Sequence, residues 1–336
     1  MNSIKIVGSK EEWEAFTHFH PEANFLQSWN WGVFHQNLGK EIFRVGLYED
    51  DRLSAIALCV KETAKRGTYL TIAGGPIPFS SPHLQPLMEH IREIAKQERC
   101  DFVRLRPQEL DSDLSRQTAR RTGFKESPLY LTADLTLQLD IQQPEEELLR
   151  QMRKSTRYEI KRAEREGITV RMSESPEDIR GFYENEVELA KKQHFVPFSY
   201  KFLYEQFKAF AKDGQAVLFH ASKDSELLAS AFIIFYNNEA VYHYGVSTPA
   251  NTKWPGAHAC QWAAIKEAKR RGLKRYNFWG VAPKDRPGHR FAHLSVFKRG
   301  FGGEEVQYLP AHDLPISRKY PAIRVFELLR KVVRRV

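Results

Sequence analysis

One succession of secondary-structure elements occurs twice in this chain of 336 residues. Hydrophobic periodicity, turn residues and helix caps predict the order β-α-α-β-β-β-α-β in each half. The first copy is expected at residues 4–7, 9–19, 28–38, 42–48, 53–62, 68–73, 83–97 and 101–106. The second copy is expected at 168–172, 175–192, 200–212, 216–221, 228–236, 240–246, 257–271 and 275–279. Such a repeat predicts two mixed α/β domains of similar design.

A basic segment joins the two copies. The chain is expected to break at residues 140–144 and then to form one helix of about 22 residues that ends at Gly167. We therefore place the first domain at residues 1–142 and the second, which would carry the substrate groove, at 143–311. The segment 312–336 is expected to return to the first domain.

The C-terminal end of the chain reads as a basic amphipathic helix. Its apolar face consists of Ile323, Phe326, Leu329 and Val333, and Lys or Arg residues occupy the other positions. This pattern favours packing on the first domain, while contact with an anionic membrane stays open as an alternative.

The formal net charge is +9, and the excess lies in residues 150–171 and 266–299. Such stripes attract polyanions, although basic helices are also often only solvated faces.

The three cysteines form no CxxC pair, which argues for a reducing compartment and against a zinc site or a disulfide framework. There is no apolar run of about 18 residues and no signal-peptide pattern, so the cytoplasm is the expected location.

Residues 276–309 are the most informative stretch for function. They read as a strand stopped by Gly280, a basic loop, a helix, and Lys298 just before a glycine-rich turn at 300–303. Backbone at glycines lets a ligand approach closely, and a lysine beside it supplies a cation with three donors. This combination suits a phosphate or a transient oxyanion. The alternative is a surface lysine before a hairpin.

Several segments together resemble the Fem family (FemABX) of non-ribosomal peptidyltransferases. They are Gln27-Ser28 with Trp31, LLRQMRKSTRYEIKRAEREGITV, VYHYGVS, GAHACQWAAIKEAKRRG, YNFWGV and FKRGFGGEEVQY. The resemblance implies two tandem GNAT-type acyltransferase domains with a C-terminal helix that returns to the first. It also implies transfer of an amino acid from aminoacyl-tRNA, as co-substrate, to the side-chain amine of a peptidoglycan precursor stem peptide. That acceptor would be lipid II or UDP-MurNAc-pentapeptide.

The resemblance also implies roles for single residues. Lys298, with Phe297 beside it, matches the catalytic site, where the lysine would stabilise the charge of the acyl-transfer intermediate. Tyr242 and Tyr244 match tyrosines that line the substrate channel. Because residues two apart on a strand share a face, we expect both rings to point into one groove. A buried aromatic strand face is the alternative.

Other matches are weaker or depart from the family pattern. Lys192 stands nearest to an arginine that contacts the precursor's phosphates, and Arg157 and Trp31 are further candidates for substrate binding. Lysine is a point charge and lacks the bidentate fork of arginine. The acidic residue that relatives carry before the last proline of domain one is Arg106 here. The amine must therefore lose its proton to water or to the leaving tRNA hydroxyl.

An aminoacyl ester is already activated, so the protein need not supply a covalent nucleophile, and we expect no cofactor and no metal. The chain has no GxSxG elbow and no HExxH motif. A CoA-binding loop would fall at residues 253–258, where His258 would crowd a phosphate. We expect a monomeric aminoacyltransferase, cytoplasmic or peripheral at the inner face of the membrane. The alternatives are an acyl-CoA-dependent N-acyltransferase and a non-catalytic basic module that binds RNA or membrane.

Overall fold

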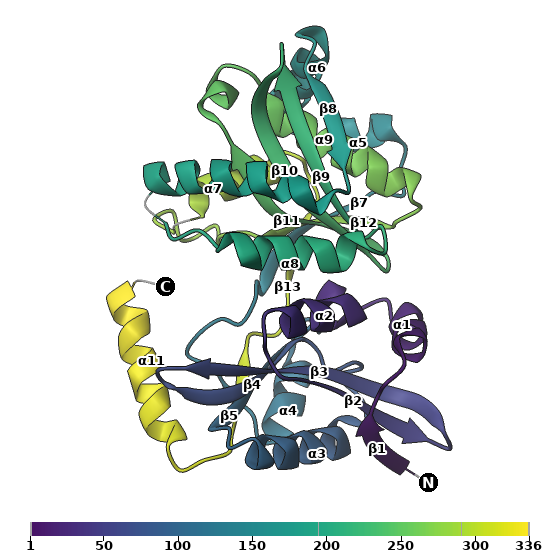
Figure 1. The fold of residues 1–336 in the computed structure, drawn as a ribbon, viewed down its shortest axis with the longest axis vertical. Helices are drawn as coiled ribbons and strands as arrows, with labels where there is room; N and C mark the ends of the chain where they lie inside the picture. The colour runs from purple at the N-terminus through teal and green to yellow at the C-terminus, as the bar shows by residue number, and fades with distance from the viewer. Residues whose placement is uncertain (1, 194, 290, 335–336) are drawn as a thin grey trace. The chain divides into compact units, whose positions relative to one another are not determined.

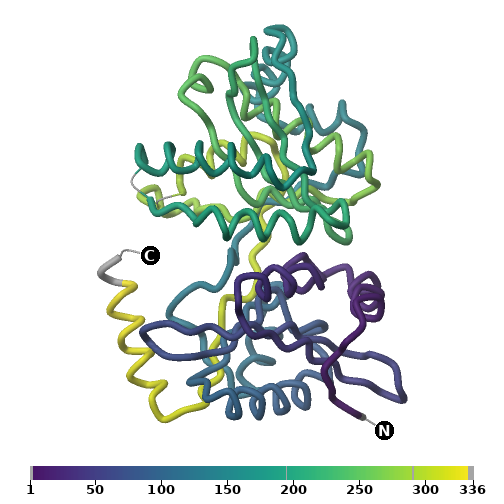
Figure 2. The backbone as a smooth tube through the Cα atoms, in the orientation of Figure 1, coloured from purple at the N-terminus to yellow at the C-terminus, as the bar shows by residue number. Residues whose placement is uncertain are grey.

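A computed structural model describes residues 2–193, 195–289 and 291–334 of the chain. The chain forms two compact units (Figures 1 and 2). Unit 1 combines Met1–Asp134 with Gln307–Val336, and unit 2 comprises Leu135–Val306. Within the described ranges, no helix is both long and apolar enough to cross a bilayer.

Unit 1 is built on a seven-stranded sheet in the order β1-β2-β3-β4-β5-β14-β6. Its strands are β1 (Asn2–Ile6), β2 (Ile42–Glu49), β3 (Arg52–Ala64), β4 (Gly67–Gly74), β5 (Phe102–Pro107), β6 (Lys125–Glu126) and β14 (His312–Pro315). Strands β4 and β5 are parallel, and the other pairs of neighbours are antiparallel. The sheet thus takes its strand β14 from the C-terminal part of the chain.

Six helical segments of the described part of the chain accompany this sheet. They are α1 (Lys10–Phe19), η1 (Phe25–Gln27), α2 (Trp29–Asn37), α3 (Leu84–Gln97), α4 (Asp113–Arg121) and α11 (Tyr320–Arg334). Helix α1 begins where its cap predicts, because the Ser9 hydroxyl accepts a 3.1 Å hydrogen bond from the Glu12 amide. Helix α3 buries Leu87, Ile91 and Ile94 in the core of unit 1.

Unit 2 contains a second seven-stranded sheet, in the order β13-β7-β12-β11-β10-β9-β8. Its strands are β7 (Leu135–Asp140), β8 (Thr169–Ser173), β9 (Ala216–Lys223), β10 (Glu226–Tyr236), β11 (Glu239–Ser247), β12 (Arg275–Gly280) and β13 (Glu304–Gln307). Strands β11 and β12 are parallel, as β4 and β5 are in unit 1. The predicted element order therefore occurs in both units, and the expected mixed α/β repeat is confirmed.

The helical segments of unit 2 cover both faces of its sheet. They are α5 (Glu145–Gln151), α6 (Lys154–Arg165), η2 (Pro176–Asp178), α7 (Ile179–Gln193), α8 (Tyr200–Ala211), η3 (Pro249–Thr252), α9 (Gly256–Arg270) and α10 (Ala292–Arg299). Helices α7 and α8 lie side by side (Figure 1). Phe232 of β10 contacts Phe207 of α8, whereas its neighbour Ile233 joins the core cluster that contains Ile265 of α9. Adjacent residues of one strand thus serve opposite helical layers.

Two boundaries differ from the sequence expectation. The expected long helix is interrupted at Met152 and Arg153, because the Arg153 amide donates to the Gly300 carbonyl at 2.9 Å and leaves the helical ladder. Strand β7 pairs with β12 and so belongs to unit 2. The chain therefore passes between the units at residues 134–135 and 306–307, whereas we expected 142–143 and 311–312.

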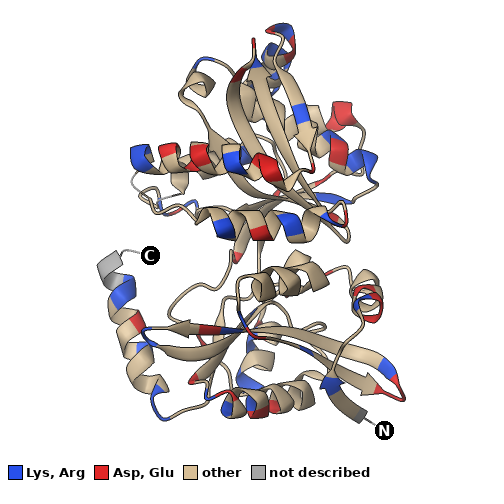
Figure 3. Ribbon diagram, in the orientation of Figure 1, with Lys and Arg blue, Asp and Glu red and all other residues tan. Residues whose placement is uncertain are grey.

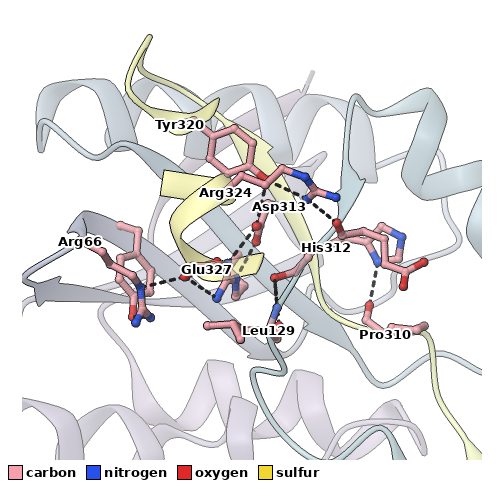
Figure 4. Close-up of polar contacts among 12 residues, drawn as sticks. Arg66, Leu129, Pro310, His312, Asp313, Tyr320, Arg324 and Glu327 are labelled. Atoms are coloured by element: carbon pink, nitrogen blue, oxygen red, sulfur yellow. Dashed lines mark hydrogen bonds and ion pairs between the residues drawn. The ribbon is translucent and has the colours of Figure 1, made fainter. Parts of the chain in front are cut away.

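Helix α11 returns to unit 1, as expected, and buried ion pairs hold it there (Figure 4). Arg104 of β5 binds Asp313 of β14 through two hydrogen bonds of 2.6 and 2.9 Å. The same guanidinium binds Glu327 of α11 at 2.6 Å, and Arg66 lies 2.8 Å from Glu327. The Tyr320 hydroxyl donates to Asp313. A charge network of this kind is costly to break because each remaining partner stays buried.

We predict that Arg104→Met lowers the free energy of unfolding by about 3–5 kcal/mol, because it leaves the carboxylates of Asp313 and Glu327 buried without their shared cation. Urea denaturation followed by circular dichroism measures the change. Arg116→Met is the matched control: Arg116 also binds Asp111 through two 2.6 Å hydrogen bonds, but its side chain is 38% exposed. That variant should lose about 1 kcal/mol or less. Equal losses in the two variants would contradict this account.

Candidate functional site

The candidate site lies where β11 and β12 separate. Their parallel pairing joins Glu239–Val241 to Arg275–Asn277 and then ends, although β11 continues to Ser247 and β12 to Gly280. Beyond this point the two strands no longer bond to each other, so their facing backbone groups are available to other partners. A glycine carbonyl and several aromatic side chains gather at these strand ends.

Lys298 lies at the C-terminal end of α10, beside the end of β12. Its Nζ donates a 2.7 Å hydrogen bond to the Gly280 carbonyl, and the side chain is 5% exposed. Nζ also lies 5.7 Å from the centre of the Tyr242 ring. Burial lowers the pKa of Lys298 to about 7, because the apolar surroundings disfavour the charged form. The lysine is therefore not a surface residue, and its protonation changes near neutral pH.

Phe297 points to the neighbouring helix α9. Its ring meets His258 at 5.1 Å and Phe301 at 5.3 Å between centroids. Phe297 also lines a hollow of about 260 Å³ at the N-terminal end of α9. The remaining lining residues are Glu159, Arg162, Asn251, Thr252, Lys253, Trp254, Pro255, Ala257 and His258. Lys298 and Phe297 thus place their side chains in two adjoining environments, a buried strand end and a hollow with basic and aromatic walls.

The expectation that Tyr242 and Tyr244 face one groove is wrong. Ile233 pairs with Tyr242 and Phe232 with Tyr244, so β11 contains an extra residue, His243, in a β-bulge. Residues paired across an antiparallel ladder share a face. Tyr242 therefore lies with Ile233 on the α9 face, near Lys298, and Tyr244 lies with Phe232 on the α7–α8 face. Gly245 is required here, since a Cβ at this position would lie 1.8 Å from the Tyr242 hydroxyl.

A polar cluster on the α7–α8 face was not anticipated from the sequence. Glu186 of α7 is 7% exposed and Gln206 of α8 is fully buried. The Gln206 Nε2 lies 2.7 Å from His243 Nε2, and the ring of His243 lies 4.0 Å from that of Tyr244. The sequence did contain a signal for this cluster, because Glu186 stands at a position of α7 where the helical period predicts an apolar residue.

Three further residues that the sequence suggested for substrate binding make no recorded contact with Lys298. Arg157 of α6 donates from Nη1 to the carbonyls of Arg150 and Met152, so its guanidinium caps the end of α5. Lys192 is exposed at the end of α7. Trp31 belongs to α2 in unit 1 and packs on Phe34, with 5.0 Å between the ring centres. The substrate-binding roles of these residues stay predictions.

The absence of a metal site is also an untested expectation. Within residues 2–193, 195–289 and 291–334, no three His, Cys, Asp or Glu side chains lie close enough together to hold a metal ion. The three cysteines are buried and unpaired.

Two family models match the chain. The model of the FemAB family matches residues 9–127, and the model described as an acetyltransferase (GNAT) domain matches residues 150–288. Among curated proteins, the aminoacyltransferase FemA of Staphylococcus aureus (strain MW2) is 34% identical over 113 residues. That match covers 33% of this chain and 26% of FemA, so the chain matches only about a quarter of its curated relative.

Solved structures extend the similarity to the whole fold. A crystal structure of FemX superposes with a TM-score of 0.86 at 18% identity and covers 97% of this chain and 100% of that one. The structure of L-PGS from Bacillus licheniformis gives a TM-score of 0.58 at 17% identity, covering 96% and 99% of the two chains. A tandem GNAT protein from the clavulanic acid pathway gives 0.59 at 10% identity, covering 94% and 99%.

These structural likenesses establish the fold, namely the expected tandem GNAT-type architecture. Together with the family model and the FemA match, they confirm the resemblance to the Fem family that the sequence indicated. Residues 9–127 thus match the FemAB family model, residues 150–288 match a GNAT domain model, and the chain is built from two tandem GNAT-type domains.

Proposed function

We propose that this protein transfers an amino acid from aminoacyl-tRNA to the side-chain amine of a peptidoglycan precursor stem peptide, either lipid II or UDP-MurNAc-pentapeptide. The observation that carries the proposal is the burial of the Lys298 ammonium at the open end of β12, on the domain that matches the GNAT model. The match of residues 9–127 to the FemAB family model and the aminoacyltransferase name of the matched relative support it.

In this proposal the acceptor amine attacks the ester carbonyl of the donor. A tetrahedral intermediate forms with negative charge on its oxygen, and collapse breaks the ester C–O bond and releases the tRNA hydroxyl. The protonated Lys298 Nζ stabilises that oxygen. A donor held in a buried site acts more strongly than one in water, because the local dielectric constant is low. The role of Lys298 is thus to stabilise the developing negative charge, and it forms no covalent bond to the substrate.

The hollow beside Phe297 suits the nucleotide end of the donor. Its wall includes Trp254, and the amines of Lys223 and Lys253 lie 4.6 and 4.9 Å from the centre of that ring. Aromatic rings flanked by cations bind single-stranded nucleotides by stacking and by attraction to phosphate. We assign this hollow to the terminal nucleotide of the aminoacyl-tRNA.

The rival donor is acyl-CoA, whose pyrophosphate GNAT enzymes bind at a helix N-terminus. At the start of α9, the Ala257 amide already donates to Asn251 Oδ1 at 2.8 Å. Gly256 is explained by packing, since a Cβ there would lie 2.4 Å from the Leu228 Cβ. These contacts disfavour CoA. Isothermal titration with CoA distinguishes the two hypotheses, because tight binding of CoA would favour acyl-CoA as the donor.

We predict that Lys298→Met lowers turnover by about 10²–10³-fold, the loss typical of a missing oxyanion donor. Initial rates with charged tRNA and precursor measure the effect. In the wild type, turnover should also fall as the pH rises past about 7, because Lys298 then loses its proton. Normal turnover of the variant would remove Lys298 from the chemistry.

Stability provides the control for this variant. Burial lowers the folded-state pKa of Lys298 to about 7 from a usual value of 10.5, so the charged lysine destabilises the fold. That cost is fully present below pH 7 and is lost as the pH rises to 10.5. Lys298→Met should therefore be more stable than the wild type at pH 6 by roughly 2–5 kcal/mol, and the difference should shrink toward pH 10. Inactivity together with increased stability excludes unfolding as its cause.

We further propose that the protein is cytoplasmic and contacts the inner face of the membrane through α11. Four apolar side chains of this helix are exposed: Val325 (56%), Phe326 (52%), Leu328 (44%) and Leu329 (62%). The single acidic residue of α11, Glu327, is buried against Arg104, so the exposed charges are basic (Figure 3). Apolar and cationic side chains on one exposed helix match an anionic lipid surface.

We predict that the double variant Phe326→Glu, Leu329→Glu no longer sediments with vesicles of phosphatidylglycerol and phosphatidylcholine, whereas the wild type does. Each substitution removes apolar area and adds repulsion from anionic lipid. Phe19→Glu is the matched control, because Phe19 is 86% exposed on α1. It should bind like the wild type. Vesicle binding that is unchanged in the double variant would overturn the membrane proposal.

A further inference from the structure

Helix α7 buries an acidic side chain in the middle of its apolar face. Its buried residues Ile179, Phe182, Glu186 and Ala190 are spaced three, four and four apart, so they form one stripe. This stripe packs toward α8 and β11. An apolar residue at position 186 would complete it, and a carboxylate there lowers stability unless it serves another purpose.

Among the described residues, the Glu186 carboxylate has no cation beside it to offset its burial. Its Oε2 atom is buried without a hydrogen bond, and no Lys or Arg of the described residues forms an ion pair with it. Burial alone raises the pKa of Glu186 to about 7. A buried carboxylate without a cation of its own is suited to a cation that arrives with a ligand.

Glu186 acts on Tyr244, and the polar groups clustered around Tyr244 are uncharged near neutral pH. From β11 come Tyr244, whose pKa is raised by burial and by the Glu186 carboxylate, and His243, whose pKa burial lowers to about 3. From α8 comes the uncharged amide of Gln206. Phe198 adds an aromatic wall, with its ring centre 5.3 Å from that of Tyr244. Glu186 is therefore the group of this cluster that titrates near pH 7.

This cluster connects to the strand end that holds Lys298. His243 lies 6.1 Å from Trp279 between ring centres, and Trp279 directly precedes Gly280, whose carbonyl binds Lys298. The bulge at His243 turns Tyr244 to the α7–α8 face while Tyr242 stays beside Lys298. The strand ends thus have a carboxylate on one side and an ammonium on the other.

We infer that Glu186, near Tyr244, binds the ammonium group of the acyl acceptor and accepts one of its protons before attack. The inference rests on the proposed aminoacyl transfer and names the acceptor side of that site.

The proton balance is complete. The acceptor arrives as an ammonium with three protons, and one passes to Glu186 Oε2. The amine nitrogen then bonds to the ester carbonyl carbon. As the ester C–O bond breaks, a second proton goes to the leaving tRNA oxygen, and the third remains on the new amide nitrogen. Glu186 later releases its proton to water.

The test compares Glu186→Gln with the wild type, using charged total tRNA and UDP-MurNAc-pentapeptide that contains lysine. Turnover should fall by about 10²–10⁴-fold, the range for a lost general base, with the KM for the donor unchanged. The rise of kcat/KM for the acceptor around pH 7 should disappear. Glu188→Gln, on the exposed side of α7 with 63% of its side chain accessible, is the matched control and should keep the wild-type rate.

A binding measurement without donor separates this role from a structural one. The wild type should bind the free-amine precursor at least about tenfold more tightly than its side-chain N-acetylated form, whereas Glu186→Gln should bind both alike. Because the variant removes an unpaired buried carboxylate, its Tm should not fall. A Glu186→Gln enzyme with wild-type turnover would overturn the inference and leave the proposed function standing. A wild-type protein that transfers no amino acid would remove both.

Discussion

The burial of one ammonium group at the end of β12 constrains the rest of the candidate site. Among the residues that the structure describes, Lys298 has a single short hydrogen bond, to the Gly280 carbonyl, to offset the loss of water around its charge. That carbonyl is available because β11 and β12 stop pairing after Val241 and Asn277. The separation of these two parallel strands therefore exposes the carbonyl that binds Lys298. The buried lysine is held there with a pKa near neutrality.

The bulge in β11 gives the two sides of this opening different chemistry. On the α9 face, Tyr242 and Lys298 adjoin a hollow with basic and aromatic walls. On the α7–α8 face, Tyr244 stands with Glu186 and Gln206. A reaction between an ester and an amine needs such an asymmetry, since one partner develops negative charge and the other must lose a proton. Unit 1 has a different organisation, in which buried ion pairs fix the C-terminal helix.

The sequence predicted the fold more completely than it predicted the candidate site. Periodicity and capping predicted the repeated element order because each element is encoded locally, as Ser9 and Glu12 show at α1. The break at Met152 and the placement of β7 were missed, because each depends on a partner distant in the chain. Tyr242 and Tyr244 were expected to share a face, and only the register against β10 reveals the extra residue between them. Glu186 could have been noticed, since an acid interrupts the apolar stripe of α7.

The central claim is that this domain joins an amine to an aminoacyl ester. Mass spectrometry of the acceptor tests it most directly, after incubation of the protein with charged total tRNA and a lysine-containing precursor. The account predicts that the precursor gains the mass of one or more amino-acid residues, and that this gain is lost when the tRNA is deacylated beforehand. A precursor of unchanged mass, or one that gains an acyl group only when acyl-CoA is supplied, would contradict it.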